Sequence, residues 1–192
     1  MGIVIGIDVG ISTTKIVGII EGSKVLSPIR IKATDPVTSL YGAFGKFLYV
    51  NKIQLQDIEK VMLTGVGSAY INEPIYNLPT EKADEFLADG LGARYETGLS
   101  RMIVVSMGTG TSIVKCDGND INHIGGIGIG GGPRQGLSRL LLNTDDIKQV
   151  ARLAETGDVS HINVLIKDIS ANPLPGLPMD AIASLCGNTK SN

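Results

Sequence analysis

The sequence predicts an α/β fold made of two similar half-domains. The order strand, strand, strand, helix occurs twice along the chain. Each copy opens with a turn rich in glycine and hydroxyl side chains, placed between two runs of valine and isoleucine. Glycine allows positive φ and close backbone approach, and successive N–H groups in such a turn form a concavity that binds anions. Two such turns, with an aspartate in the first, predict a nucleotide held between the half-domains.

The composition excludes several classes of protein. With 192 residues, 43% of them hydrophobic, the chain can build one domain or two small lobes around a core. A net charge of −2 and the lack of tryptophan argue against a nucleic-acid partner. Cys116 and Cys186 are far apart and lack metal-ligand spacing, so we expect two reduced cysteines rather than a disulfide or a metal site. Because no apolar run is long enough to cross a membrane and no signal-peptide pattern occurs, we expect a cytoplasmic protein with no membrane partner.

The first half-domain begins with a strand at residues 2–9 that is apolar on both faces. Further strands are expected at 15–21, 25–32 and 60–64, with a hairpin turn at 21–24. Asp35 as N-cap and Pro36 at the first helical position start a helix. Its apolar stripe is formed by Leu40, Phe44, Phe47 and Leu48. A second helix is expected from residue 82 to about residue 99.

The second half-domain repeats this order. Strands are expected at residues 102–106, 111–117 and 122–124, with a hairpin turn at 117–120. A glycine run at 125–132 leads into a helix at 133–142, and further helices are expected at 145–155 and 159–169. Residues 172–178 are proline-rich and irregular. We expect no strand after Gly125, so the chain divides into an N-terminal lobe, 1–100, and an incomplete second lobe, 101–192.

The first turn contains the candidate magnesium ligand. Asp8 ends a buried strand, where a carboxylate is costly unless it is paired or binds a metal. It is suited to orient Mg²⁺ near phosphates, or alternatively to cap the turn as an Asx residue. The residues after it are suited to bind phosphate oxygens or, as an alternative, to serve as ordinary strand residues. They are Gly10, Ser12, Thr13, Thr14 and Lys15.

The second turn is the sharper of the two. It consists of Gly108, Thr109, Gly110, Thr111 and Ser112. This alternation of glycines and hydroxyl residues exposes several backbone N–H donors. A simple hairpin turn is the alternative, and it explains one of the glycines. The run that ends in Gly130, Gly131 and Gly132 precedes a helix, where an anion is favoured. Close packing in the cleft is the alternative for this run.

Acidic residues near the start of the second helix are candidates for a general base. Glu81, Asp84, Glu85 and Asp89 all lie there, and the residues alone do not choose among them. Favourable interaction with the helix dipole is the structural alternative. His123 and His161 have no metal-ligand partner at suitable spacing, so surface or core positions are expected. Arg134 and Arg139 are suited to contact a phosphate or carboxylate, or to lie on a solvated helix face.

Five motifs in this order resemble the type II pantothenate kinases, part of the actin, sugar-kinase and heat-shock chaperone ATPase superfamily. They are Asp8-Val9-Gly10 with Lys15, Thr64-Gly65, Asp84-Glu85-Phe86, the second turn at 108–112, and the glycine run at 125–132. The resemblance covers residues 1 to about 177. It implies a ribonuclease H-like, actin-type ATPase fold with two lobes of mixed sheet plus helices. It also implies a homodimer.

The resemblance implies transfer of the ATP γ-phosphoryl group to the primary hydroxyl of pantothenate, in coenzyme A synthesis. Asp8 then lies near Mg²⁺ and the phosphates, the second turn holds phosphates, and Glu85 is the catalytic base. Substrate contacts are expected at His123, Gly125, Gly126 and Arg134.

Three departures from the family pattern leave alternatives open. His123 stands where the family usually has an arginine, so another small hydroxyl substrate is an alternative acceptor. Ile11 replaces a usual glycine, and the family's adenosine-binding region lies beyond residue 192. A non-catalytic ATPase-fold fragment or switch is therefore a further alternative. Dehydratase activators share the first motif, but Cys116 and Cys186 do not match their cluster ligands.

Overall fold

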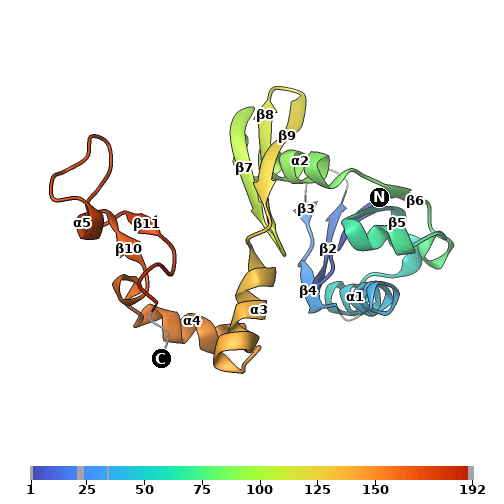
Figure 1. The fold of residues 1–192 in the computed structure, drawn as a ribbon. Helices are drawn as coiled ribbons and strands as arrows, with labels where there is room; N and C mark the ends of the chain where they lie inside the picture. Colours follow the sequence, from blue (N-terminus) through green and yellow to red (C-terminus); the bar gives the residue numbers. More distant parts are fainter. Residues whose placement is uncertain (1, 21–23, 34, 190–192) are drawn as a thin grey trace. The chain divides into compact units, whose positions relative to one another are not determined.

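The computed structural model describes residues 2–20, 24–33 and 35–189. The chain forms two compact units, residues 1–134 and 135–192, and the first contains both predicted turns. Figure 1 shows the elements along the chain. None of the helices in the described residues is long and apolar enough to cross a membrane.

A six-stranded mixed sheet forms the base of the first unit. Its strand order is β3-β2-β1-β5-β6, with β4 also paired to β2. Strand β1 is antiparallel to β2 and parallel to β5, which is parallel to β6. The strands are β1 (Ile3–Val9), β2 (Thr13–Ile20), β3 (Lys24–Val25), β4 (Ile29–Lys32), β5 (Ile58–Thr64) and β6 (Thr80–Lys82).

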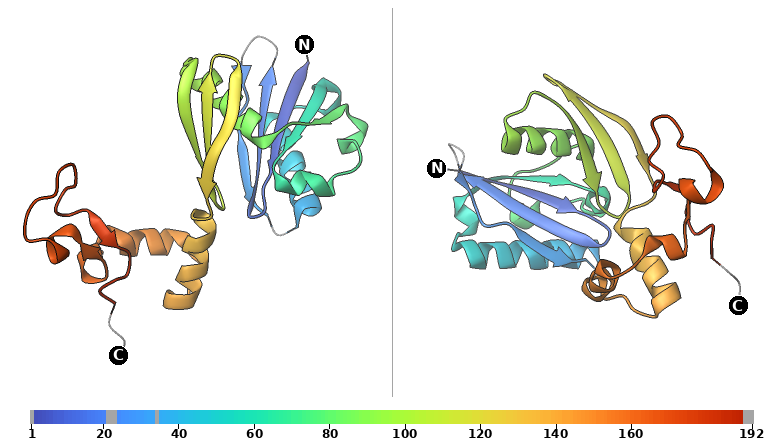
Figure 2. Two further views of the ribbon diagram at one scale, coloured as in Figure 1. Left: turned by 45° about the horizontal axis from the view of Figure 1, so that its top comes forward. Right: turned by 90° about the vertical axis from the view of Figure 1, so that its left-hand side faces the viewer.

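One face of this sheet is the core of the unit. Alternate residues of β1 are at most 5% exposed and belong to one cluster with the stripe of helix α1 (Pro36–Asn51). Asp35 caps α1 by accepting from the N–H of Thr38 at 2.7 Å, as predicted. Helices α1 and α2 (Glu85–Thr97) lie on opposite sides of the sheet in the right-hand view of Figure 2. The other residues of β1, Val4, Gly6 and Asp8, therefore face α2.

A three-stranded antiparallel sheet, β7-β8-β9, completes the first unit. Its strands are β7 (Arg101–Met107), β8 (Thr111–Asp117) and β9 (Asp120–Ile127). Helix α2 packs on this sheet at Gly90, where an added Cβ would lie 2.5 Å from Ile121 Cγ2 and 3.1 Å from Cys116 Sγ. Helix α2 thus packs against the three-stranded sheet and also lies over one face of the first sheet.

The second unit is small and has few buried side chains. Asn163 organises it: its Oδ1 accepts from the N–H of Cys186, and its carbonyl accepts from Asn188 Nδ2, both at 2.9 Å. Helix α3 (Gly131–Leu142) begins at the end of the first unit. The other elements are α4 (Ile147–Glu155), η4 (Val159–His161), β10 (Val164–Leu165), α5 (Ile166–Ile169) and β11 (Ile182–Ser184).

Short 3₁₀ turns in the first unit are η1 (Leu55–Asp57), η2 (Val66–Tyr70) and η3 (Ile75–Asn77).

Three sequence predictions of local structure were wrong, and one strand was missed. The strand at 25–32 is interrupted around Pro28, which has no N–H to donate. The helix at 159–169 is instead η4, β10 and α5, because β10 pairs with β11. Strands do follow Gly125, since β9 continues to Ile127 and β10 and β11 come later. The short edge strand β6 was missed because it is polar and only three residues long.

Other boundaries shift by little. Helix α3 begins at Gly131, two residues before the expected start, so Pro133 lies within its first turn. The hairpin turn expected at 21–24 lies largely outside the described residues. The lobe boundary expected at residue 100 falls between α2 and β7 and stays a prediction.

Candidate active site

The β1–β2 hairpin places Asp8 beside Lys15. The two residues are direct partners in the antiparallel register, and Lys15 Nζ lies 2.7 Å from Asp8 Oδ2. Their side chains are 28% and 53% exposed, so the pair faces open space at the end of the sheet. The first turn thus presents a paired carboxylate and ammonium group rather than an isolated charge.

The same register aligns a row of polar side chains across four strands. Asp8 pairs with Thr64 of β5 on one side, and Lys15 pairs with Arg30 of β4 on the other. Since paired residues lie side by side on one face of a sheet, the row runs Thr64, Asp8, Lys15, Arg30. This is the face opposite α1.

The strand end at Gly65 is held close to the first turn. Gly65 has φ +83°, and an added Cβ there would meet the Asp8 carboxylate and lie 2.7 Å from the carbonyl oxygen of Val9. Gly67 approaches the same carbonyl, with an added Cβ 2.6 Å away. Glycine is therefore required at both positions for this close approach.

The start of α2 brings a second carboxylate to this face. Asp84 is the N-cap and accepts from the N–H of Leu87 at 2.9 Å, so Glu85 is the first helical residue. Partial burial, followed by the charges of Asp8 and Asp89, raises the pKa of Glu85 above its usual range, while Lys15 opposes the shift. Glu85 keeps contact with solvent, which limits the shift. The structure thus distinguishes Asp84, which caps the helix, from Glu85, whose pKa is affected by the charges of Asp8 and Lys15.

A cavity of about 460 Å³ lies on this face, between the first sheet and α2. The polar side chains that line it are Asp8, Lys15, Arg30, Thr64 and Asp89. Its apolar lining comes from β1, β2, β5 and the α2 region, including Val17, Met62, Ala83 and Ala88. A mostly apolar cavity with a few convergent polar groups is typical of a small-molecule site.

The second turn meets the first. Ser12 Oγ and Thr109 Oγ1, 97 residues apart in sequence, are 3.5 Å apart. In Figure 2 the ends of the β1–β2 and β7–β8 hairpins lie side by side. Among the described residues, the N–H groups of Thr109 and Gly110 have no protein acceptor. The structure therefore brings the two predicted turns together with donors still available.

The end of the glycine run packs against the backbone of the second turn. The N–H groups of Gly131 and Gly132 donate to the carbonyls of Gly108 and Thr109 at 2.8 and 2.9 Å. An added Cβ at Gly130 would lie 2.6 Å from Gly110 O. Two of the helix N–H groups are therefore already used by protein acceptors. The close-packing alternative describes this geometry, and a phosphate contact of Gly130, Gly131 or Gly132 stays a prediction.

Strand β9 places His123 next to the candidate base. The His123 ring stacks on Phe86, the residue after Glu85, with centroids 4.2 Å apart and an interplanar angle of 18°. Gly125 and Gly126 lie in β9 opposite Ile113 and Ser112. An added Cβ at Gly126 would be 2.7 Å from Thr111 O, so Gly126 allows close strand approach.

The remaining site candidates are spread over the second turn and beyond it. Thr111 Oγ1 donates to Ile129 O at 2.7 Å, and Ser112 pairs with Ser106 within the sheet. Arg134 lies in the first turn of α3. Substrate contacts for Gly125, Gly126 and Arg134 stay predictions.

Sequence reasoning missed Arg30, and it named Thr64 only as part of the Thr64-Gly65 motif, without a role in the site. Only strand pairing aligns the two residues with Asp8. Asp89 was one of several open candidates. Its spacing of four residues from Glu85, which puts both on one helix face, was the available signal.

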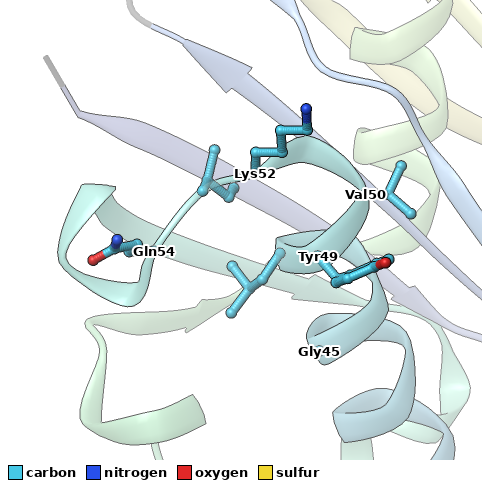
Figure 3. A pocket seen from close by; sticks show the side chains of 7 residues that line it. Gly45, Tyr49, Val50, Lys52 and Gln54 are labelled. Atoms are coloured by element: carbon cyan, nitrogen blue, oxygen red, sulfur yellow. The ribbon is translucent and has the colours of Figure 1, made fainter.

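Another hollow lies at the C-terminal end of α1 (Figure 3). It is lined by Gly45, Leu48, Tyr49, Val50, Lys52, Ile53 and Gln54. It contains no carboxylate among these residues, and α1 lies on the sheet face away from Asp8. This hollow is therefore unsuited to the proton and phosphate chemistry expected of the site.

The donor set fits magnesium only together with phosphates. No group of three or more His, Cys, Asp or Glu side chains within the described residues is able to hold a metal ion. Mg²⁺ is usually held by one or two carboxylates, waters and substrate phosphates rather than by a protein cage. Asp8 next to the two turns meets this requirement.

A family model described as Fumble matches residues 94–192. A type II pantothenate kinase of Staphylococcus epidermidis is 36% identical over 141 residues, covering 69% of this chain and 52% of that protein. The type II pantothenate kinase of Staphylococcus aureus is 34% identical over 189 residues, covering 96% of this chain and 66% of that protein. The chain thus spans about half of the first relative and about two thirds of the second.

Solved structures share the fold. The activator of 2-hydroxyisocaproyl-CoA dehydratase from Clostridium difficile, with bound ADPNP, has a TM-score of 0.65 at 17% identity, covering 85% of this chain and 59% of that one. A ROK family protein from Streptococcus pneumoniae, in complex with sucrose, has a TM-score of 0.51 at 14% identity, covering 82% and 68%. At these identities the likeness concerns the fold alone, and it confirms the expected α/β, actin-type ATPase fold.

Proposed function

The chain belongs to the Fumble family, that of the type II pantothenate kinases, and from this membership we propose that the protein phosphorylates pantothenate with ATP in coenzyme A synthesis. The observation that carries the proposal is the position of Glu85. Glu85 lies at the start of α2, close enough to Asp8 and Lys15 for their charges to act on its pKa, and one helical turn before Asp89, which lines the cavity. A base, a cation and an acceptor cavity thus meet at one face.

In this proposal Glu85 is the general base. It accepts the proton of the primary hydroxyl as that oxygen bonds to the γ-phosphorus of ATP. The bond between this phosphorus and the bridging oxygen of ADP breaks, and ADP leaves with the electron pair. A raised pKa suits the role, because a base is most effective when its pKa approaches the working pH.

The two turns hold the phosphates in different ways. Lys15 supplies a positive charge, and Asp8 is suited to hold Mg²⁺, which when bound neutralises charge on the phosphates. Thr109 and Gly110 offer backbone N–H donors, with Ser12 and Thr13 on the facing turn. Positioning of this kind accounts for most of the catalysis in phosphoryl transfer. By the same family resemblance we propose a cytoplasmic homodimer.

A second candidate is a kinase for a different small alcohol. His123 occupies the position where the family usually has an arginine, and it stacks on Phe86 beside Glu85. A histidine offers fewer donors to a substrate carboxylate than a guanidinium group does. An acceptor without that carboxylate, such as pantetheine, is then favoured.

The test is ATP consumption by the full-length protein against pantothenate, pantetheine and unrelated polyols. We expect Glu85→Gln to lower kcat by roughly 10²- to 10⁴-fold, the range for loss of a general base. Glu96→Gln, on the exposed end of the same helix, is the matched control and should keep full activity. Phosphorylation of pantetheine alone would favour the second candidate, and no phosphorylated alcohol would refute the kinase proposal.

A further inference from the structure

The cavity between the first sheet and α2 is lined by polar groups that the proposed phosphoryl transfer does not use. Asp8 is paired with Lys15 at 2.7 Å, whereas Thr64 and Asp89 line the same cavity from β5 and α2. Thr64 is the direct strand partner of Asp8, and Asp89 lies one helical turn beyond Glu85. Both residues therefore border the reacting region without belonging to either phosphate turn.

Each of these two residues has a buried oxygen atom with no hydrogen-bond partner among the described residues, Thr64 Oγ1 and Asp89 Oδ2. A buried polar atom without a partner is costly, so in native structures such atoms are nearly always satisfied. Both residues line one cavity, so a rotation of their side chains would bring the two oxygens to a ligand held there.

A hydroxyl group is the ligand chemistry that fits both oxygens. It is able to donate to the Asp89 carboxylate and to accept from the Thr64 hydroxyl. An amide N–H only donates, so it leaves Thr64 without a group to donate to. A ligand carboxylate only accepts, and it would also be repelled by Asp89.

The spacing of the two carboxylates suits two hydroxyls of one molecule. Residues four apart on a helix share one face, with Cβ atoms about 5–6 Å apart. Glu85 and Asp89 have this spacing. The apolar part of the lining, from residues such as Val17, Met62 and Ala88, is suited to the carbon skeleton that joins the hydroxyls. Pantothenate contains such an arrangement, a 1,3-diol with methyl groups between its two hydroxyls.

Resting on the proposed function, we propose that Asp89 and Thr64 form a specificity site that binds a second hydroxyl of the acceptor alcohol. Glu85 takes the proton from the first hydroxyl, and Asp89 receives a hydrogen bond from the second. Asp89 and Thr64 are positioning residues, since neither touches the reacting atoms. The acceptor class is therefore a small diol rather than a simple alcohol.

The experiment compares pantothenate with its analogue in which the secondary hydroxyl is replaced by hydrogen. Steady-state kinetics are measured with the full-length protein, on the pH plateau, for the parent and for Asp89→Asn, Thr64→Val and the control Glu96→Gln. We expect the parent to prefer pantothenate in kcat/KM by roughly 10- to 100-fold, the range for a hydrogen bond to a charged group. Asp89→Asn should raise KM for pantothenate by a similar factor, with kcat within a few-fold and the analogue little affected.

The outcomes separate this inference from the proposed function. If the parent phosphorylates pantothenate and the analogue equally well, the specificity site is refuted while the kinase proposal stands. An unchanged KM in both Asp89→Asn and Thr64→Val refutes it too. If the parent phosphorylates no alcohol, the proposed function fails first. Thermal unfolding of each variant checks folding, and the analogue comparison in the parent needs no variant at all.

Discussion

The two glycine turns of the first unit have similar sequences but different physical character. The β1–β2 turn is bordered by a charged pair, with Lys15 2.7 Å from Asp8. The β7–β8 turn contains no charged residue, and its backbone is fastened to the start of α3 through Gly131 and Gly132. We therefore expect the first turn to act through side-chain charge and the second through the shape and donors of its backbone.

This difference follows from what surrounds each turn. Strand β1 is central in a sheet buried on one face by α1, so its end is rigid and is able to hold a carboxylate in place. Strand β7 is an edge strand of a small sheet, and one of its faces is exposed: Ile103 is 55% and Met107 79% exposed. The second turn obtains its rigidity locally, from glycine packing. Changes to charge should therefore damage the first turn, and changes to volume the second.

Of the changes that separate the two turns, removing the charge of the first turn is expected to have the largest effect. Asp8→Asn should lower kcat by about 10²- to 10³-fold, as for other losses of one preorganised electrostatic group. The paired Lys15 would also lose its partner, 2.7 Å away. Titration of activity with Mg²⁺ is the measurement, and the variant should need more Mg²⁺ than the parent. A normal Mg²⁺ dependence would mean that Asp8 does not contribute to the metal site.

The next largest effect is expected from adding volume beneath the second turn. An alanine Cβ at Gly130 would lie 2.6 Å from Gly110 O and 2.7 Å from Thr109 O. Gly130→Ala should destabilise the protein by about 1–3 kcal/mol through overpacking and weaken ATP binding. Gly136→Ala is the control, because an added Cβ there meets nothing within 4 Å. That control should be neutral or slightly stabilising in urea unfolding.

A moderate effect is expected in the pH dependence. Glu85 must be ionised to act as a base, so kcat/KM falls as pH drops through its pKa. Partial burial, Asp8, Asp89 and Asp84 raise this pKa, and Lys15 lowers it. The acidic limb should therefore lie at higher pH than for an ordinary glutamate. Asp89→Asn should move the limb to lower pH, whereas Glu96→Gln should not, and an unmoved limb in Asp89→Asn would contradict the assignment.

The smallest effect is expected from the contact between the turns. Ser12 Oγ and Thr109 Oγ1 are 3.5 Å apart and both residues are exposed. Ser12→Ala should change the free energy of unfolding by less than about 0.5 kcal/mol, as for most surface substitutions. A larger loss would show that this contact joins the two hairpins more tightly than its length indicates.

Local patterns predicted most of the first unit. Alternating apolar residues predicted β1, and the Asp35-Pro36 start predicted α1 because both signals act within a few residues. The same reasoning failed for 159–169, where the pairing of β10 with β11 overrides a helical pattern. Such pairing joins residues far apart in sequence, so a local pattern contains no signal for it.

The sequence by itself determined the two turns, their glycines and the set of acidic candidates for the base. Only the tertiary structure decided which acid has which environment: Asp84 caps α2, while Glu85 lies near Asp8 and Lys15. Strand register likewise aligned Thr64 and Arg30 with Asp8. The packing of α2 placed Asp89 in the lining of the same cavity. The physical reason is that turn chemistry is local, whereas charge, burial and register depend on neighbours that the fold brings together.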